Sequence, residues 1–252
     1  MISDITYETI DGHKFMVIKP IEELDNLAYD KMKPHMESMG GHWRERVKGF
    51  VFNIQTLERT SHSEYVEKIQ FFPTPEPVAN KMIDVSGVLE FNPDNKPFIL
   101  EPSAGKGALL DALDNYAGNR RYRREIVVEP VEENANILRS KGHYVEEMTF
   151  EKFYHRNKKN KEFRFTHVFM NPPFSGGCEA THTMMAYNML QPNGTLVGIV
   201  SENSLYYKDQ VYLEFQQWLK EVKAEIIPVE HGSFRESGTT VDTVIIKIAK
   251  GA

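Results

Sequence analysis

The sequence predicts an α/β protein in which a mostly parallel sheet ends in an antiparallel pair of strands. Three observations predict this fold. From about Pro97 onward, short apolar segments alternate with segments of helical period. The last two apolar segments follow each other with no helix between them. Small, polar and proline residues come directly after the apolar segments, where parallel α/β sheets bind their ligands.

Composition narrows the class of protein. The 252 residues are 40% hydrophobic and 26% charged, which is typical of a globular chain and excludes a coiled coil or a collagen-like protein. Cys178 is the only cysteine, and the nine histidines show no metal-ligand spacing, so we expect neither a disulfide nor a metal site. No apolar run is long enough for a membrane span and no signal peptide is recognisable, so a cytoplasmic protein without membrane contact is expected. The net charge of −6 argues against a protein that coats nucleic acid, although a local basic groove stays possible.

Residues 1–70 are polar and mixed, and they predict a small α+β accessory region. A strand is expected at Lys14–Ile18, a helix at Glu22–Met39 and a short hairpin between Gly40 and Phe52. Basic residues stand between aromatic residues in this hairpin, a pattern that suits contact with phosphates and bases. These candidate DNA-contact residues are Trp43, Arg44, Arg46 and Lys48. A plain solvated hairpin is the alternative.

Three prolines in Pro73–Pro77 mark a boundary, so residues 71–252 are expected to form a second domain. Thr74 is expected to cap a helix that Pro75 or Pro77 begins and that Val78 and Met82 anchor. The strands expected after it are Phe98–Leu100, Glu125–Glu129, Tyr144–Glu146, Thr166–Met170, Thr195–Val200, Ala224–Val229 and Thr243–Ala249. The helices expected between them are Ala108–Tyr116, Val131–Lys141, Glu179–Leu190 and Gln210–Glu221.

A glycine loop follows the first of these strands. Gly105 and Gly107 permit a tight turn and close approach of a ligand, but Leu110 stands where a dinucleotide fingerprint has its third glycine. Glu129 ends the second strand, where an acid can accept hydrogen bonds from ribose hydroxyls. This combination favours a nucleoside without phosphates, and S-adenosylmethionine fits. Glu101 could meet its cationic amino-acid end, or it could be a strand-end residue that faces solvent.

The fourth strand is followed by Asn171-Pro172-Pro173-Phe174. Two prolines fix φ and remove two backbone donors, so local carbonyls are left as acceptors. The side-chain oxygen of Asn171 and the Pro172 carbonyl could both accept from one exocyclic amino group. Phe174 would offer a ring on which a flat base can stack. The alternative is a proline-rich turn with a buried phenylalanine.

With these segments in this order, the chain resembles the S-adenosylmethionine-dependent DNA N6-adenine methyltransferases of the gamma arrangement, over about residues 70–249. The resemblance implies a Rossmann-like seven-stranded sheet, mostly parallel with the last strand antiparallel. It implies S-adenosylmethionine as cofactor and adenine in DNA as substrate. Many members continue into a target-recognition domain, so sequence specificity is expected from residues 1–70 or from a partner subunit.

The resemblance also implies roles for single residues. The catalytic segment is Asn171, Pro172, Pro173 and Phe174, and Phe234 in the late segment His231–Thr243 is expected to face the target base or to pack in the core. The cofactor residues implied are Phe72, Thr74, Glu101, Pro102, Ala104, Gly105, Gly107, Glu129, Pro130, Thr149, Phe150 and Asn171. Thr149 stands where the family usually has an acid that contacts the cofactor adenine.

The expected mechanism is direct in-line transfer of the sulfonium methyl group to the N6 amine of a flipped adenine. Cys178 follows two glycines and no proline, so a cysteine nucleophile for C5-cytosine methylation is not expected. Three alternatives stay open: methylation of RNA, methylation of a glutamine amide as in release-factor methyltransferases, and a non-catalytic binding module. The biological setting, whether restriction, phage or mobile element, is equally open.

Overall fold

The computed structural model describes residues 2–10, 13–20, 42–44, 48–53, 72–90, 96–116, 123–235, 237 and 241–251. The chain divides into two compact units, Met1–Lys68 and Ile69–Ala252. This division lies two residues from the boundary expected at residue 70. None of the helices within the described ranges is both long and apolar enough to cross a membrane.

The first unit contains a four-stranded antiparallel sheet in the order β1-β2-β4-β3. Its strands are β1 (Ile2–Ile10), β2 (His13–Pro20), β3 (His42–Arg44) and β4 (Gly49–Asn53). The expected strand at Lys14–Ile18 is part of β2, and the expected hairpin is the β3–β4 pair, in which Trp43 lies opposite Phe50. The helix expected at Glu22–Met39 lies outside the described residues.

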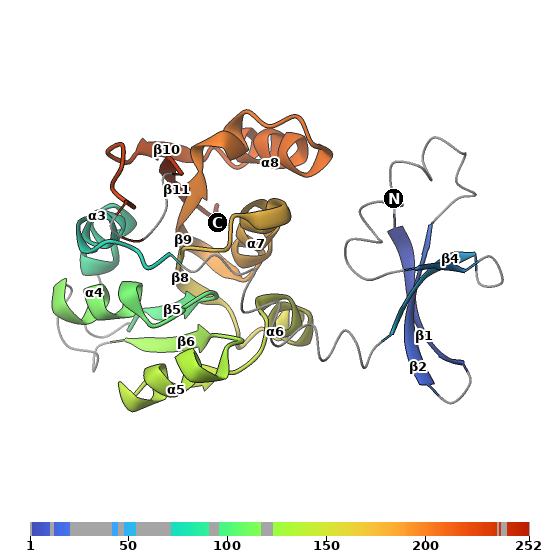
Figure 1. Cartoon of the computed structure of the whole chain (residues 1–252). Helices are drawn as coiled ribbons and strands as arrows, with labels where there is room; N and C mark the ends of the chain where they lie inside the picture. Colours follow the sequence, from blue (N-terminus) through green and yellow to red (C-terminus); the bar gives the residue numbers. More distant parts are fainter. Residues whose placement is uncertain are drawn as a thin grey trace. The chain divides into compact units, whose positions relative to one another are not determined.

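The second unit is built on a seven-stranded sheet in the order β10-β11-β9-β8-β5-β6-β7 (Figure 1). Its strands are β5 (Phe98–Glu101), β6 (Arg124–Val128), β7 (Val145–Glu146), β8 (Phe165–Met170), β9 (Leu190–Ser201), β10 (Glu225–Pro228) and β11 (Thr243–Ala249). β5 pairs in parallel with β6 and β8, and β7 and β9 extend the parallel part on either side. β11 is antiparallel to both β9 and β10, which confirms the expected antiparallel last strand.

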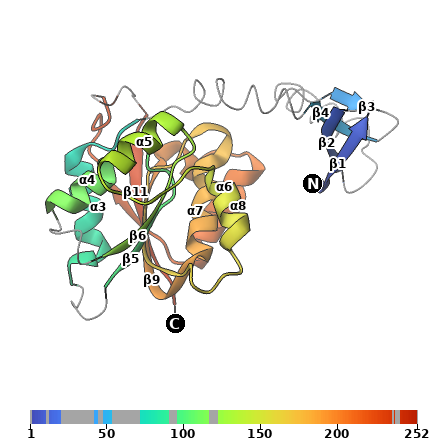
Figure 2. The same cartoon turned by 90° about the horizontal axis from the view of Figure 1, so that it is seen from below.

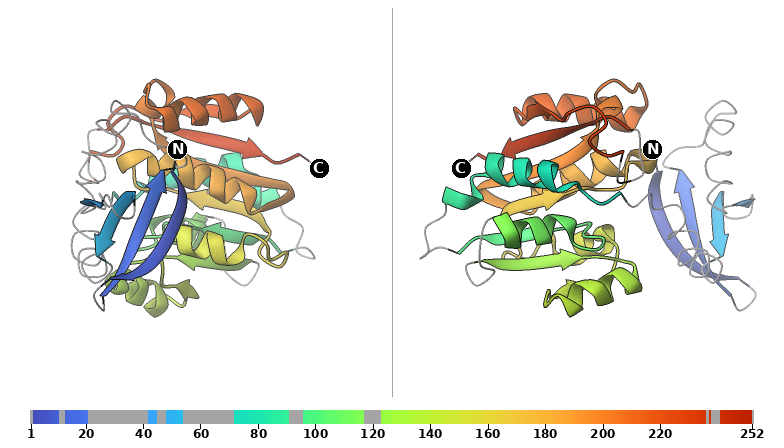
Figure 3. Two further views of the ribbon diagram at one scale, coloured as in Figure 1. Left: turned by 90° about the vertical axis from the view of Figure 1, so that its right-hand side faces the viewer. Right: turned by 60° about the vertical axis from the view of Figure 1, so that its left-hand side comes forward.

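Helices cover both faces of this sheet, with α3, α4 and α5 on one side and α6, α7 and α8 on the other (Figures 2 and 3). They are α3 (Glu76–Ser86), α4 (Ala108–Tyr116), α5 (Glu132–Ser140), α6 (Phe150–Asn157), α7 (Cys178–Asn188) and α8 (Gln210–Glu221). Within the described residues the unit also has short 3-10 turns at η2 (Val88–Glu90), η4 (Ser175–Gly177) and η5 (Glu202–Leu205).

Alternating side chains of the strands divide the core into two layers. Ile99 and Val127 pack with α3, α4 and α5, whereas the next residues, Leu100 and Val128, pack with α6, α7 and α8. Successive side chains of a strand point to opposite faces, so a strand that is apolar throughout must have helices on both sides. β8 is buried along its whole length, which agrees with this rule and places its end deep in the unit.

Two local expectations need correction. Thr74 does not cap α3: Pro75 occupies the N-cap position, and the Thr74 hydroxyl is engaged elsewhere. The sequence also does not predict α6. The strand before this helix, β7, has only two residues, so the alternation of strand and helix is hard to recognise there. Phe150, Phe153 and Tyr154 have helical spacing, and Phe150 and Phe153 are buried.

Candidate functional site

The expected site residues follow strands that are neighbours in the sheet. β5 ends at Glu101, β6 at Val128 and β8 at Met170. From β5 the chain builds β6 and β7 on one side and then β8 and β9 on the other, so the strand order reverses between β5 and β8. Ligands of open parallel sheets bind beyond the carboxyl ends of the strands at such a reversal. The glycine loop, Glu129 and Asn171 therefore share one edge of the sheet.

The loop after β5 turns through two glycines with positive φ. Gly105 has φ 55° and Gly107 has φ 90°. A Cβ on Gly107 would lie 2.8 Å from Cδ2 of Leu138, a buried side chain of α5. Gly107 therefore serves the packing of the loop against α5, and its positive φ agrees with the tight turn that the sequence predicts. Close approach of a ligand to it stays a prediction. Next to it, Ala104 donates its backbone N–H to the Val128 carbonyl at 3.2 Å, and Pro102 is buried.

Glu129 joins the end of β6 to this loop. Its Oε2 accepts from the backbone N–H of Gly105 at 2.8 Å. Its Oε1 accepts from Val131 N–H at 2.9 Å and from Nδ2 of Asn134 at 3.2 Å. Burial raises the pKa of Glu129, and these three hydrogen bonds oppose the rise. The expected ribose contact of Glu129 would use the lone pairs that these hydrogen bonds leave. Pro130, the next residue, is half-buried.

Glu101 ends β5 as a buried acid with an unsatisfied oxygen. The residue is 2% exposed, and its Oε2 has no hydrogen-bond partner among the described residues. Burial raises the pKa of Glu101 well above its ordinary value, and the negative charges of Glu129 and Glu125 raise it further. The hydroxyl of Ser103 is likewise buried and unsatisfied within the described part of the chain. Buried polar groups are normally paired, so these atoms are candidates to meet a ligand; the alternative that Glu101 faces solvent is wrong.

Asn171 follows β8, and its side-chain amide is held from one side. Nδ2 donates to the Phe72 carbonyl at 2.9 Å and to the Thr74 hydroxyl at 3.1 Å. Because a carbonyl only accepts, the amide must present its nitrogen to Phe72 and its oxygen to the other side. Thus the structure brings together Phe72, Thr74 and Asn171, three residues to which the resemblance assigns a cofactor role, and the Thr74 hydroxyl holds a protein side chain.

The turn after Asn171 leaves acceptors open. No described residue donates to Oδ1 of Asn171 or to the Pro172 carbonyl. Pro172 is buried, while Pro173 and Phe174 are half-buried. The Phe174 ring packs in part against the core below α3, α4 and α5. Two neighbouring acceptors and a partly accessible ring thus lie at the carboxyl edge of the sheet.

Comparison of the whole chain with solved structures finds the same architecture elsewhere. A type I restriction-modification methyltransferase subunit from Streptococcus thermophilus is similar, with a TM-score of 0.57, 17% identity, and coverage of 71% of this chain and 44% of that chain. A proposed class I S-adenosylmethionine-dependent methyltransferase from Listeria monocytogenes has a TM-score of 0.55, 11% identity, and coverage of 79% and 67%. An O-methyltransferase from Bacillus cereus, solved with SAH, has a TM-score of 0.53, 13% identity, and coverage of 78% and 91%.

The second unit has the Rossmann-like methyltransferase fold. The expected fold class is therefore confirmed. This chain spans less than half the length of the Streptococcus thermophilus subunit. No protein-family model and no curated protein matches the sequence.

Two residues expected at the cofactor adenine lie at the start of α6, which follows β7. Thr149 is the N-cap of α6, and its hydroxyl accepts from Lys152 N–H at 3.4 Å. Phe150 is 3% exposed and packs edge-on against the ring of His182, with centroids 5.4 Å apart. Because the segment after β7 enters a helix, the Phe150 ring is turned into the core. Contact of Thr149 and Phe150 with the cofactor adenine stays a prediction.

Phe234, expected to face the target base or to pack in the core, takes the second option. Its side chain is 2% exposed and belongs to the core below α3, α4 and α5. The turn that carries it is closed by a hydrogen bond from Arg235 N–H to the Gly232 carbonyl at 3.0 Å. A stacking role for Phe234 is corrected, because its ring has no open face.

The expected DNA-contact residues belong to the first unit. Trp43 is half-buried and Arg44 exposed on β3, and the exposed Lys48 precedes β4. Arg46 lies outside the described residues. Contact of these residues with DNA stays a prediction.

A buried polar cluster that the sequence did not predict follows the Asn171–Phe174 turn. Glu179 is fully buried, its Oε1 accepts from the Tyr212 hydroxyl at 3.2 Å, and burial raises its pKa to about 7. Burial, with the charges of Glu151 and Glu179, raises the pKa of the Cys178 thiol to about 11. Such a thiol is a poor nucleophile at neutral pH. A glutamate in the first turn of a helix is ordinarily exposed. The sequence therefore does not indicate this cluster, which forms only because α8 packs against α7.

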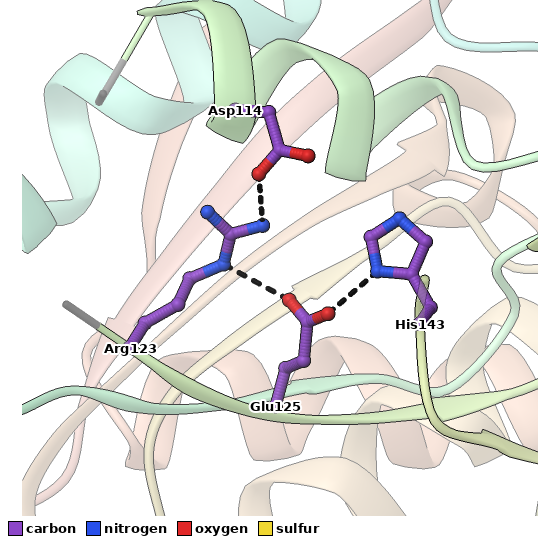
Figure 4. Close-up of polar contacts among 4 residues, drawn as sticks. All are labelled: Asp114, Arg123, Glu125 and His143. Atoms are coloured by element: carbon purple, nitrogen blue, oxygen red, sulfur yellow. Dashed lines mark hydrogen bonds and ion pairs between the residues drawn. The ribbon is translucent and has the colours of Figure 1, made fainter. Parts of the chain in front are cut away.

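A second polar network lies at the amino-terminal end of β6, away from this edge (Figure 4). Arg123 contacts Asp114 of α4 at 2.6 Å and Glu125 of β6 at 2.9 Å, and His143 Nδ1 lies 2.5 Å from Glu125. Burial opposes ionisation of Glu125, but the hydrogen bonds and charges of His143 and Arg123 lower its pKa on balance. This network ties α4 and the approach to β7 to β6.

Proposed function

We propose that this protein transfers a methyl group from S-adenosylmethionine to the exocyclic N6 amine of adenine in DNA. One observation carries the proposal: Oδ1 of Asn171 and the Pro172 carbonyl are two adjacent acceptors that no described residue uses. They stand at the strand reversal, on the same edge as the glycine loop. An amino group with two hydrogens is the ligand that such a pair fits.

The residues beside the glycine loop fit the proposed cofactor. The unsatisfied, buried carboxyl of Glu101 suits the cationic amine of an amino-acid group, which would lower the raised pKa of this acid. Glu129 holds the loop and keeps lone pairs for ribose hydroxyls. The similar Bacillus cereus structure was solved with SAH, which supports the same class of ligand here.

The chain's own part in the reaction is to bind and orient the amine. Its lone pair is conjugated with the adenine ring, so the planar amine is a weak nucleophile. Asn171 Oδ1 and the Pro172 carbonyl would accept hydrogen bonds from its two N–H groups and direct the lone pair out of the ring plane. When bound, S-adenosylmethionine would supply an electrophilic methyl group and leave as S-adenosylhomocysteine, and the methylated amine would release its extra proton to water. Proximity and oriented dipoles would then provide most of the acceleration.

DNA is the proposed substrate, with a partner subunit as a source of specificity. The likeness to a restriction-modification methyltransferase subunit supports this choice. A net charge of −6 gives little non-specific attraction to phosphates. Weak DNA binding by the isolated chain is therefore expected unless Trp43, Arg44, Arg46 and Lys48 or a partner assist.

A radiolabel assay tests the proposal. The protein is incubated with S-adenosylmethionine tritiated in the methyl group and with unmethylated DNA, bulk RNA or a release factor. We expect label in DNA as N6-methyladenine, and loss of at least about a hundredfold in the rate for Asn171→Ala. Asn115→Ala, at an exposed site on α4, is the matched control and should keep full activity.

The other outcomes decide between the alternatives. Label in RNA or in a release-factor glutamine would replace DNA by that substrate. Cofactor binding without transfer to any of them would mean a non-catalytic binding module.

A further inference from the structure

The amide of Asn171 is held by two acceptors from a segment almost a hundred residues earlier in the chain. The Phe72 carbonyl lies 2.9 Å and the Thr74 hydroxyl oxygen 3.1 Å from Nδ2. A side-chain amide nitrogen has two hydrogens, so these two acceptors satisfy it completely. Rotation of the amide by half a turn would put Oδ1 against the Phe72 carbonyl, where two acceptors would face each other.

The segment that supplies both acceptors is itself held in place. Pro73 and Pro75 fix two φ angles around Thr74. The Pro73 carbonyl accepts from the Ser237 hydroxyl at 2.7 Å. The Pro75 carbonyl accepts from Val78 N–H and Ala79 N–H at 3.0 and 2.9 Å, which anchors it to α3. Thr74 is 6% exposed, so its hydroxyl has little freedom to turn toward solvent.

We propose that Thr74 is a positioning residue, which holds the Asn171 amide with Oδ1 turned toward the substrate amine. The proposal rests on the proposed function, in which Oδ1 must accept. With Phe72 alone, one hydrogen bond would orient the amide; Thr74 engages the second hydrogen and restricts the side-chain torsion. If the amide turned over, Nδ2 would meet the substrate amine donor to donor, and the pyramidal amine would lose one of its two acceptors.

The expected consequence is a loss of rate that more cofactor does not repair. Thr74→Val keeps the shape of the side chain and removes the acceptor, whereas Thr74→Ser keeps the hydroxyl. Methyl transfer in a single turnover at saturating cofactor should fall about tenfold in Thr74→Val, the value of about one hydrogen bond. Thr74→Ser should stay close to the wild type. A rate for Thr74→Val that equals the wild type, or that recovers as cofactor is raised, would overturn the proposal.

A double-mutant cycle separates positioning of Asn171 from a direct effect on cofactor or fold. In an Asn171→Ala background, Thr74→Val should cause no further loss of rate, because the group that it positions is gone. An equal loss in both backgrounds would show that Thr74 acts independently of Asn171.

A spectroscopic measurement reads the same contact without any substrate. Hydrogen exchange of the Asn171 side-chain NH2, assigned by its disappearance in Asn171→Asp, should be about tenfold faster in Thr74→Val and unchanged in Thr74→Ser. Unchanged exchange in Thr74→Val would refute the positioning role. If the wild type methylates nothing, the proposed function fails, and this exchange measurement still decides whether Thr74 holds Asn171.

Discussion

The carboxylate of Glu129 accepts a hydrogen bond from the backbone N–H of Gly105 at 2.8 Å, so the residue after β6 holds the loop after β5. Its other oxygen accepts from Val131 N–H and the Asn134 amide, at the start of α5. An acid at the tip of the second strand is thus part of the scaffold of the site. Any ribose that binds there would join a hydrogen-bonded group that is already oriented.

The first prediction concerns this contact. In Glu129→Ala, the Gly105 amide should exchange its hydrogen at least about tenfold faster, because the charge-assisted bond that protects it is gone. Amide exchange measured by NMR checks this. Glu133→Ala, at an exposed position of α5, is the control. Equal protection of Gly105 in Glu129→Ala would show that the loop is held by its own turn.

Glu101 predicts a pH dependence of cofactor affinity. Its raised pKa means that it ionises only above the ordinary range of a glutamate. Attraction for a cationic amine is therefore full at high pH and lost as pH falls through the raised pKa. Calorimetric titration with S-adenosylmethionine at several pH values above the ordinary pKa of a glutamate should show this fall. Glu101→Gln should bind about ten- to a hundredfold more weakly at the upper end and vary little with pH.

The matched control is Glu132→Gln, an exposed acid in the first turn of α5. It should follow the wild-type curve. A Glu101→Gln variant with wild-type affinity at every pH would remove Glu101 from the cofactor site.

Cys178→Ala should keep methyl transfer within about twofold of the wild type, because burial raises the pKa of its thiol to about 11 and leaves little thiolate. The assay is the radiolabel transfer to DNA. Loss of activity together with a covalent protein–DNA adduct would instead point to a cysteine nucleophile and to cytosine as the target.

Glu179 predicts that the free energy of unfolding falls as pH rises. Its pKa is 4.5 ordinarily and about 7 in the folded protein. Between these values the folded state keeps a proton that the unfolded chain has lost. The stabilisation is full below the unfolded pKa and is lost as pH approaches the folded one, with a slope of up to about 1.4 kcal/mol per pH unit.

Glu179→Gln is neutral in both states, so its stability should lack this component. Urea denaturation of both proteins at several pH values measures the difference. Parallel curves for variant and wild type would mean that Glu179 is ionised in the folded protein.

Two glycines test the packing of the glycine loop. Gly107 and Gly87 both have positive φ, 90° and 75°, so an alanine at either position costs about 1–2 kcal/mol in backbone conformation. A Cβ on Gly107 would also meet Leu138 at 2.8 Å, whereas nothing lies within 4 Å of one on Gly87. Gly107→Ala should therefore be less stable than Gly87→Ala by at least about 1 kcal/mol in urea denaturation. Equal losses would show that Leu138 moves aside without cost.

Much of the fold of the second unit could be predicted from local pattern. α4 and α8 begin and end where the sequence predicts, because each is a clear amphipathic segment between turn residues. α6 was not predicted, because the strand before it has only two residues. Of the site, the glycine loop, Glu129 and the Asn171–Phe174 turn were found because each follows a strand, which is a rule of sequence order.

The sequence does not show which side chains contact each other in the folded protein. Three phenylalanines follow strands of the sheet: Phe150, Phe174 and Phe234. Phe150 and Phe234 are buried, and of the three only Phe174 is partly accessible. In the sequence, Glu101 and Glu179 do not differ from other glutamates. Burial in the folded protein excludes water from both carboxyl groups and thereby raises their pKa values.

The sequence by itself determined the alternation of strands and helices and the order of the chemical segments, because hydrophobic period and turn residues act over a few neighbours. Only the tertiary structure decided that Thr74 and Phe72 hold the amide of Asn171, and that Oδ1 therefore faces away from them. The physical reason is distance along the chain. A hydrogen bond between residues 97 positions apart depends on how the whole sheet is assembled, and no local pattern records it.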